Sequence, residues 1–369
     1  MTTLNIPGSP NPGDTYEENG VIYTWNGEYW TANNAQGFDD RYVNADGDQM
    51  TGDLTVPSLN GGPLAGFRNQ IINGDFRIWQ RGNTRTYQES TFVVYSSDRW
   101  ANYKGNSTGT CTTTKVAVSD IPGFSTALQM TGSGASYTQT CYQPIELDSG
   151  SIAPFGVGQT WTLSCYVKGS AAGSSELFAQ YNDSSDLTAG LQSIKSEAIN
   201  FTTSWQRFTL TFTIPAATGS PSVMNVGLYD PNGTVSTNVL VTGFQLEPGS
   251  VATPFEHRPN ELALCQRYYF TIRGNLFTKF GAIYTNNDGA SYLSVVLPVT
   301  MRALPDVTFN DIALVRSGQN ISTGDIDTVN FAGTHISIDF SSSYGIPNES
   351  SDFAQLRESN ATFNLEAEL

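Results

Sequence analysis

Two pairs of carboxylates in polar segments come closest to the spacing that enzyme chemistry needs. Asp183 and Asp186 lie three residues apart, and Asp325 and Asp327 lie two apart. Two carboxyl groups that flank a bound sugar act as general acid and base in glycoside hydrolysis. However, no spacing argument places either pair across a cleft, and Asp in such loops normally caps turns through local hydrogen bonds. The sequence therefore favours a turn role for both pairs and predicts that the protein is not an enzyme.

Motifs for metal or nucleophile chemistry are missing as well. His257 and His335 have no HxxxH or HExxH context, and the sequence has neither a GxSxG elbow nor a P-loop. Residues 44–48 place amide and acidic side chains at alternate positions, as a calcium loop does. Gln49 stands where that loop needs a glycine, and Thr55 stands where it needs a bidentate Glu. The sequence excludes an EF-hand.

Several polar segments instead suit recognition of sugars, because Asn, Asp, Ser and Tyr can bind hydroxyl groups and the apolar faces of sugar rings. The candidate contacts fall in three loops: Tyr181, Asp183 and Asp186; Tyr229 and Asp230; and Asn286, Asn287, Asp288 and Tyr292. An ordinary solvated turn is the competing interpretation for each of them. Trp79, Trp100 and Trp205 are expected in the core rather than on a sugar platform.

The charge of the chain limits the classes of partner that it is expected to bind. The 369 residues carry a formal charge of -16, and residues 1–63 hold nine acidic side chains against Arg41 alone. A polyanion without a basic cluster gains no counterion-release free energy on nucleic acid. Residues 1–13 lack a basic start and an apolar core, and no apolar run approaches a membrane span. We expect no nucleic-acid binding, no membrane insertion and synthesis in a cytosol.

Composition predicts a β-rich fold with two or three cores. Glycine contributes 35 residues and aromatics 12%, whereas charged residues reach only 14%, which favours strands and turns over solvated helices. The four cysteines, Cys111, Cys141, Cys165 and Cys265, show no CxxC pairing. Because the expected site of synthesis is reducing, we expect buried free thiols in strand cores rather than disulfides.

The first 63 residues predict a small three-stranded meander. Asn19-Gly20 and Asn26-Gly27 are hairpin signals seven residues apart. If both form two-residue turns, Tyr16 lies opposite Tyr23, Tyr23 lies opposite Trp30, and Val21 and Trp25 extend the same face. So small a sheet is marginal in water by itself. We expect its aromatic face to dock on sister copies or on another protein, although the core of a tiny domain is the alternative.

A larger β domain is predicted over 66–259. At least eight strand-like runs are separated by turns rich in Gly, Ser, Asn and Pro, namely 76–80, 99–103, 111–118, 136–145, 161–168, 206–214, 224–229 and 239–246. Alternation is clear over 161–167 and over 208–214, which indicates strands with one buried face. Two such sheets packed together predict a jelly-roll β-sandwich.

Residues 260–369 predict one short helix followed by a second, smaller β domain. Glu261 to Tyr269 has helical spacing of Leu262, Cys265 and Tyr269, with Asn260 as N-cap. Strand-like runs then return at 292–298, 307–315, 335–340 and 361–365.

Three blocks of the chain resemble bacteriophage tail fibre proteins, and together they cover nearly all of it. FDDRYVNADGDQMTGDLTV at 38–56 is similar to the YVN-GDxMTGxL element repeated in such fibres. NQIINGDFRIWQRG at 69–82, SDRW at 97–100 and QLEPGSVATPFE at 245–256 resemble the opening and closing strands of a phage-borne jelly roll similar to carbohydrate-binding modules. ELALCQRYY at 261–269, PVTMRALP at 298–305 and EAEL at 366–369 resemble the distal region of these fibres.

The resemblance implies a tail fibre in the virion, made in the host cytoplasm, that mediates adsorption by binding a host surface polysaccharide of O-antigen or lipopolysaccharide type. It implies attachment to a phage baseplate or tail protein through the N-terminal region, with Tyr16, Tyr23, Trp25 and Trp30 as candidates. It implies no cofactor, although similar sandwiches often hold a structural calcium. A polysaccharide-depolymerising tailspike and a purely structural virion protein are the alternatives.

Two further features bear on this family. VIYTWNGEYWTA at 21–32 looks like stretches in proteins of cyanobacterial phages, and the single MTGDL element implies a short fibre. Fibres of this kind form homotrimers. Because a nine-residue helix is unstable alone, we expect Leu262, Cys265 and Tyr269 to pack against their copies at the trimer axis. The alternative is that the helix packs within its own chain.

Overall fold

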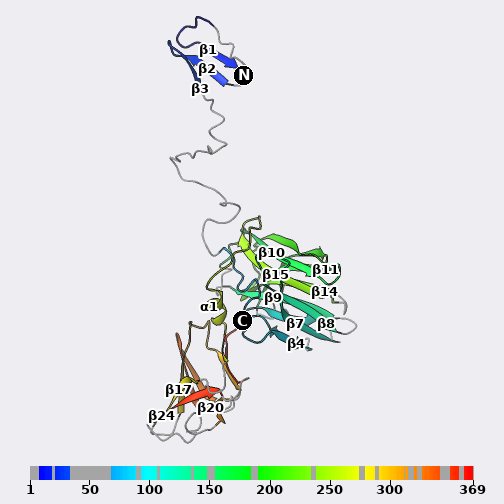
Figure 1. Cartoon of the computed structure of the whole chain (residues 1–369), viewed down its shortest axis with the longest axis vertical. Helices are drawn as coiled ribbons and strands as arrows, with labels where there is room; N and C mark the ends of the chain where they lie inside the picture. Colours follow the sequence, from blue (N-terminus) through cyan, green and yellow to red (C-terminus); the bar gives the residue numbers. More distant parts are fainter. Residues whose placement is uncertain are drawn as a thin grey trace. The chain divides into compact units, whose positions relative to one another are not determined.

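The computed structural model describes sixteen segments of the chain, namely residues 8–18, 21–33, 68–88, 93–105, 109–133, 137–147, 154–183, 190–233, 238–273, 279–286, 291–310, 312–314, 320–321, 326–340, 350–356 and 361–368. The chain divides into two compact units, Met1–Val56 and Pro57–Leu369. The MTGDL element and the excluded calcium loop lie outside the described residues. The fold is mostly β, as predicted, with one short helix in its described part (Figure 1).

The first unit contains the expected three-stranded meander, made of β1 (Thr15–Glu18), β2 (Val21–Trp25) and β3 (Trp30–Asn33). Tyr16 pairs with Tyr23 as predicted. The second predicted pairing is wrong, because Tyr23 faces Ala32 and Trp25 faces Trp30. The connection is longer than two residues, since the Asn26 Oδ1 accepts hydrogen bonds of 2.9 Å from the amides of residues 28 and 29.

The second unit opens with a sandwich of two six-stranded antiparallel sheets (Figure 1). Sheet I has the order β13-β10-β15-β8-β7-β4, from β4 (Thr84–Tyr87), β7 (Thr110–Ala117), β8 (Thr126–Ser133), β10 (Thr160–Gly169), β13 (Gln206–Thr213) and β15 (Val239–Pro248). Sheet II has the order β12-β11-β14-β9-β6-β5, from β5 (Val94–Tyr95), β6 (Ala101–Gly105), β9 (Tyr137–Glu146), β11 (Gly173–Asn182), β12 (Gln192–Phe201) and β14 (Val223–Gly233).

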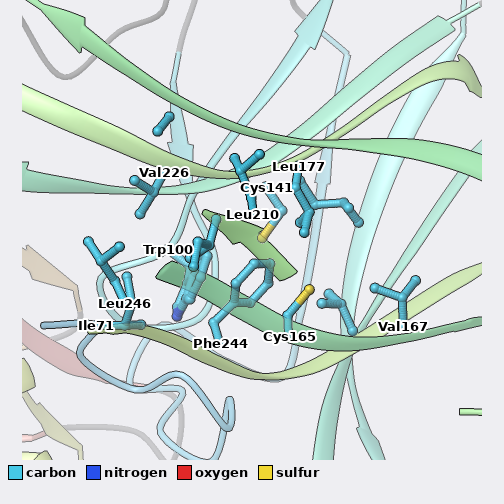
Figure 2. Packing of buried hydrophobic residues seen from close by; sticks show 14 of the residues in the cluster. Ile71, Trp100, Cys141, Cys165, Val167, Leu177, Leu210, Val226, Phe244 and Leu246 are labelled. Atoms are coloured by element: carbon cyan, nitrogen blue, oxygen red, sulfur yellow. The ribbon is translucent and has the colours of Figure 1, made fainter. Parts of the chain in front are cut away.

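The sandwich core forms where alternate side chains of both sheets meet. Figure 2 shows Trp100 and Phe244 packed with Cys141 and Cys165 between the strands. The Trp100 and Phe244 rings lie 4.7 Å apart between centroids, and both side chains are fully buried. Inward-facing positions recur at every second residue, as in 163, 165 and 167 of β10. This architecture confirms the predicted jelly-roll β-sandwich.

The sequence mispredicted one strand of this domain. Residues 76–80 are not a strand, because Asn73 and Phe76 adopt left-handed backbone angles, with φ of 57° and 53°. The segment turns around the Asn73 side chain, whose Oδ1 accepts a 3.0 Å bond from the Ile78 amide. The Phe76 ring is nevertheless buried, 4.7 Å from the Trp100 ring. Phe76 is hydrophobic because its ring packs in the core, and not because it lies in a β-strand.

The four cysteines are buried free thiols, as expected. Cys111, Cys141 and Cys165 lie in strands, whereas Cys265 lies in the helix. Burial raises the pKa of Cys111 to about 12. Thiols of this kind are inert structural side chains.

The helix α1 (Glu261–Gln266) is shorter than predicted. Asn260 makes no side-chain cap hydrogen bond. Instead, the Glu261 carboxylate is buried, where it pairs with Arg258 at 2.9 Å and accepts the amide of Asn73. Tyr269, placed in the helix by its spacing, begins β16 because its backbone pairs with β25. The end of the helix is therefore set by sheet pairing.

The C-terminal part has its own hydrophobic core, separate from that of the sandwich. Three strands form one sheet in the order β16-β25-β19: β16 (Tyr269–Arg273), β19 (Asp306–Asn310) and β25 (Thr362–Glu366). Seven strands form the other in the order β21-β20-β24-β17-β18-β23-β22: β17 (Lys279–Thr285), β18 (Ser291–Val296), β20 (Ile312–Leu314), β21 (Asn320–Ile321), β22 (Ile326–Ala332), β23 (His335–Phe340) and β24 (Ser350–Leu356).

Ion pairs centred on the buried Glu368 join this C-terminal part to the sandwich, and we call them the joint. Arg99 of the SDRW motif donates to Glu368 of the EAEL motif and lies 3.5 Å from the centre of the Tyr268 ring. Arg81 pairs with Glu366 at 3.1 Å and with Glu368 at 3.2 Å. The Glu368 and Arg99 side chains are only 4% and 2% exposed. Two motifs that the sequence singled out thus meet in one buried cluster.

A second layer of polar contacts extends the joint. Arg302 pairs with Glu146 of the sandwich at 3.0 Å and donates to the Ala367 carbonyl at 2.9 Å. Asp98, fully buried, accepts bonds of 3.0 and 2.6 Å from Gln80. Burial raises the pKa of Asp98 to about 6, although the nearby Arg81 opposes this shift.

Candidate functional site

The outer face of sheet II carries aromatic and polar side chains in register across its strands. Leu177, Ala179 and Tyr181 of β11 point into the sandwich core, so the alternate residues 176, 178 and 180 point outward. The ladder aligns Glu176 with Tyr229 on the neighbouring strand. Tyr229 in turn pairs with residue 140, which pairs with residue 103. One row therefore crosses four strands from a carboxylate to a tyrosine.

A second row of paired residues lies two positions away along the same strands. Phe178 pairs with Gly227, and Gly227 pairs with Tyr142. The rings of Phe178 and Tyr142 lie 6.5 Å apart between centroids. A Cβ atom at Gly227 would come within 2.2 Å of the Cys141 carbonyl oxygen, so only glycine fits between these two rings.

The first row and Phe178 of the second row line a hollow of about 440 Å³, which we call the groove. Its aromatic lining consists of Tyr103, Phe178 and Tyr229, of which Tyr103 and Tyr229 are half-buried. The remaining lining consists of the polar or small residues Thr138, Thr140, Glu176, Ala179, Gln180, Ser193 and Ser196 and of the exposed Leu191. Ring faces beside hydroxyl, amide and carboxylate groups match a ligand with apolar faces and many hydroxyls.

The groove contains one of the sandwich residues predicted from sequence, Tyr229. Tyr181 is a correction, since it is only 1% exposed in the core and its hydroxyl donates to the Pro215 carbonyl at 3.1 Å. Asp183 is exposed beyond the end of β11, and Asp186 lies outside the described residues. Asp230 is 8% exposed, and its backbone pairs with Gln139. The four of these residues that the structure describes do not lie together in one site.

In the C-terminal part, two predicted contacts lie together. The Asn286 Nδ2 donates to the Tyr292 hydroxyl at 3.3 Å, across the connection between β17 and β18. Asn287 and Asp288 lie outside the described residues.

The predicted carboxylate pairs are only partly described. Asp183 and Asp327 are both exposed, whereas Asp186 and Asp325 fall outside the described segments. No group of three or more His, Cys, Asp or Glu side chains within the described segments is arranged to hold a metal ion. No described helix is long and apolar enough to cross a membrane.

The tryptophan expectations hold for two of three residues. Trp79 is 8% exposed and Trp100 is fully buried. Trp205 is only half-buried, with its Nε1 donating to Asp120 at 2.9 Å and Lys168 lying 5.0 Å from the ring centre. It belongs to the surface of sheet I and not to the core.

In the first unit, the predicted aromatic face exists. Trp30 lies 5.6 Å from Trp25 and 6.4 Å from Tyr16 between ring centroids. These three residues and Tyr23 are all half-buried within the unit. They leave partly exposed aromatic surface, as a docking face would.

The three proposed axis residues do not behave alike. Cys265 is fully buried and Tyr269 is 5% exposed, both within their own chain. The Tyr269 hydroxyl donates to Asn364 at 3.0 Å. Only Leu262, at 48% exposure, leaves its side chain available to a neighbour. The short helix is thus stabilised by its own chain, as the alternative interpretation held.

Sequence reasoning missed most of the groove, because two of the strands that carry it, β11 and β12, were not recognised. Tyr103 lies in a predicted strand, but Glu176, Phe178 and Gln180 belong to β11, which was not predicted. In GSSELFAQYN, apolar residues occur on both faces, so alternation is hidden. The signal that was available is the run of nine strand residues without Gly or Pro that follows Gly173.

Comparisons with known proteins give no family for the chain. No family model matches it, and no curated protein matches it. Among solved structures, a candidate sugar binding protein from Bacteroides thetaiotaomicron VPI-5482 is similar over 49% of this chain and 100% of its own, at 13% identity and a TM-score of 0.36.

Two other structures are similar over about half of the chain. A family 11 carbohydrate-binding module from Clostridium thermocellum, in complex with a β-1,3-1,4-mixed-linked tetrasaccharide, aligns over 46% of this chain and 98% of its own, at 12% identity and a TM-score of 0.30. The enzymatically active domain of tailspike protein 4 of bacteriophage CBA120 aligns over 49% of this chain and 22% of its own, at 12% identity and a TM-score of 0.31. At these low values, the fold rests on the sheet topology and the function on the chain's own residues.

Proposed function

We propose that the chain binds a polysaccharide in the groove of sheet II. The observation that carries this proposal is the row of Glu176, Tyr229, Thr140 and Tyr103 across four strands, beside the Phe178 ring. Sugar rings present apolar C–H faces that pack on aromatic rings, and hydroxyls that pair with carboxylate, amide and hydroxyl groups. A rigid sheet holds these groups in place before the ligand arrives.

We further propose that the bound polysaccharide is left uncut. Among the described lining residues of the groove, Glu176 is the one carboxylate, whereas glycoside hydrolysis normally uses two. Incubation of the purified chain with a bound polysaccharide should leave its length distribution unchanged. Shortening of the polymer would reassign the chain to the depolymerases.

The biological setting follows from the sequence resemblance. We propose a phage tail fibre that adsorbs to a host surface glycan and attaches to the virion through the aromatic face of its first unit. Deleting residues 1–63 should abolish incorporation into particles and preserve cell binding by the soluble fragment. Loss of both activities would contradict this modular arrangement, and an absence of cell binding by the intact chain would favour a purely structural virion protein.

Tyr229→Ala tests the groove directly. Burial of an aromatic ring against a ligand is worth about 1.5 to 3 kcal/mol, so the variant should bind roughly 10- to 100-fold more weakly. Tyr29→Ala is the matched control, because Tyr29 is 58% exposed in the other unit. A glycan array identifies the ligand, and titration calorimetry measures both variants. Equal affinity of Tyr229→Ala and the wild type would refute the groove as the binding site.

A further inference from the structure

A basic hollow lies where the sandwich meets the C-terminal part, in a chain with 18 basic and 34 acidic residues. It measures about 360 Å³, and we call it the basic pocket. Three arginines line it, Arg81, Arg85 and Arg273, against a single carboxylate, Glu366. The remaining lining residues are Val93, Val94, Tyr95, Tyr269, Thr308 and Asn364. Such a local excess of positively charged side chains is unexpected in a protein with a net negative charge, and it points to a specific function.

Arg81 lines one side of the basic pocket, where contacts with its neighbours hold its side chain in place. Its guanidinium lies 3.6 Å from the centre of the Tyr269 ring and 5.4 Å from that of Tyr95. Its ion pairs with Glu366 and Glu368 belong to the joint. Its buried Nη1 has no hydrogen-bond acceptor among the described residues and lies 3.7 Å from the Asp98 Oδ1.

The other two arginines are not neutralised in this way. Arg85 on β4 and Arg273 at the end of β16 are exposed, and neither forms an ion pair with a carboxylate of the described segments. Arg81 is balanced by its acidic partners, so these two guanidinium groups supply the uncompensated charge of the basic pocket. A planar guanidinium fork matches carboxylate and phosphate oxygens.

The basic pocket and the groove lie at two ends of one aromatic cluster, in which Ala101 and Tyr142 are buried and Tyr95 and Tyr229 are half-buried. Tyr95 pairs with Ala101, which pairs with Tyr142, and that row continues to Gly227 and Phe178 at the groove. Tyr95, Tyr142, Phe178 and Tyr229 belong to one hydrophobic cluster on the outer face of sheet II. From β11 to β5 there are four strand steps, which correspond to roughly 19 Å at about 4.8 Å per step. An oligosaccharide is long enough to reach from one site to the other.

We propose that the basic pocket binds an anionic group, a carboxylate or a phosphate, carried by the polysaccharide that occupies the groove. This inference rests on the proposed function and specifies its ligand as an acidic glycan. The overall negative charge of the chain opposes an anionic polymer at long range, but salt screens that repulsion beyond about 8 to 10 Å. Within that distance Arg85 and Arg273 attract the anion, so the pocket selects acidic over neutral chains.

The test measures binding of three probes to the full chain by titration calorimetry. The probes are oligogalacturonate, its methyl ester and a glycerol phosphate oligomer. The ester keeps the sugar backbone and removes the charge, so it should bind about tenfold more weakly than the acid, since hydrogen bonds to charged groups are the strong ones. Stronger binding of the glycerol phosphate oligomer than of oligogalacturonate assigns the anion as a phosphate, and the reverse assigns it as a carboxylate.

Variants separate the two sites. Arg85→Gln and Arg273→Gln should each weaken the preferred acidic probe about tenfold and leave the ester unaffected. Arg267→Gln, an exposed arginine outside the basic pocket, is the matched control and should bind as the wild type does. Tyr229→Ala should weaken the acid and the ester alike, because it acts on the groove.

Two outcomes overturn the proposal: wild-type affinity of both arginine variants for the acidic probes, or no binding of either acidic probe to the wild type. In the first case, a loss caused by Tyr229→Ala would still support the groove. Conversely, weakening by the arginine variants alone would retain the pocket and refute the groove.

Discussion

Glu368→Gln probes the joint between the sandwich and the C-terminal part. The Glu368 carboxylate forms ion pairs with both Arg99 and Arg81, and the Glu368 side chain is 4% exposed. The change keeps the volume and one hydrogen-bond acceptor, but it leaves the buried Arg99 charge without its carboxylate. Removing one partner of a buried ion pair costs about 3 to 5 kcal/mol. We expect a fall in unfolding free energy near the lower end of that range, because Arg99 keeps its 2.7 Å bond to the Pro144 carbonyl.

Glu366→Gln is the matched control, two residues away on the same segment. Glu366 pairs with Arg81 at 3.1 Å, nearly the same distance as Glu368, but its side chain is 46% exposed. An ion pair at that exposure contributes about 0 to 1 kcal/mol. The same substitution at two neighbouring positions should therefore differ by about 2 kcal/mol or more through burial alone.

Urea unfolding followed by circular dichroism and tryptophan fluorescence measures both variants. Equal losses at the two positions, or a loss below about 1 kcal/mol for Glu368→Gln, would refute the argument that burial sets the strength of the joint. An Arg99→Met, Glu368→Gln double variant provides a further check. Because it removes the whole charge pair, it should be less destabilised than the sum of its single variants.

Two further predictions concern pH and assembly. Burial raises the pKa of Asp98 from 3.8 to about 6, so its protonated form contributes stability that is complete below about pH 3.8 and lost as the pH rises through 6. The Asp98→Asn side chain stays neutral at every pH. The unfolding free energy of this variant, relative to that of the wild type, should therefore rise by about 3 kcal/mol between pH 3.5 and pH 7. A fall in that relative free energy, measured by urea unfolding, would contradict this. A trimer has a mass of 3 × 39.9 = 119.7 kDa by light scattering, and Leu262→Asp should weaken it if the exposed Leu262 contacts a sister chain. A stable wild-type monomer at micromolar concentration would disprove trimer formation.

The fold was predictable where apolar and polar residues alternate clearly along a strand. Residues 161–168 and 206–214 alternate clearly and correspond to β10 and β13. β12 was missed because it is an edge strand whose residues 192–198 are mostly exposed and polar. Phe76 was misassigned because it has a left-handed backbone angle, its amide donates to the Asn73 carbonyl and its ring packs on Trp100, which no local pattern shows.

The site was harder to predict than the fold. Tyr229 was selected from its polar neighbourhood and does line the groove, whereas Tyr181 was selected by the same reasoning and is buried. The two tyrosines lie on opposite faces of sheet II, on adjacent strands. Which face a side chain occupies depends on the strand register, which the sequence alone did not reveal. The basic pocket draws on five strands from distant parts of the chain, so no local spacing could indicate it.

The joint also has a kinetic consequence. Arg81 and Glu366 are 285 residues apart in sequence, and Arg99 and Glu368 are 269 apart. Such contacts raise the mean sequence separation of the fold, and the entropy of closing so long a loop opposes them until both β parts have formed. We expect the joint to close late, after the sandwich and the C-terminal sheets fold. Until then Arg81 and Arg99 lack the carboxylates of Glu366 and Glu368, and we expect segment 361–368 to be cleaved by protease more readily than in the finished fold.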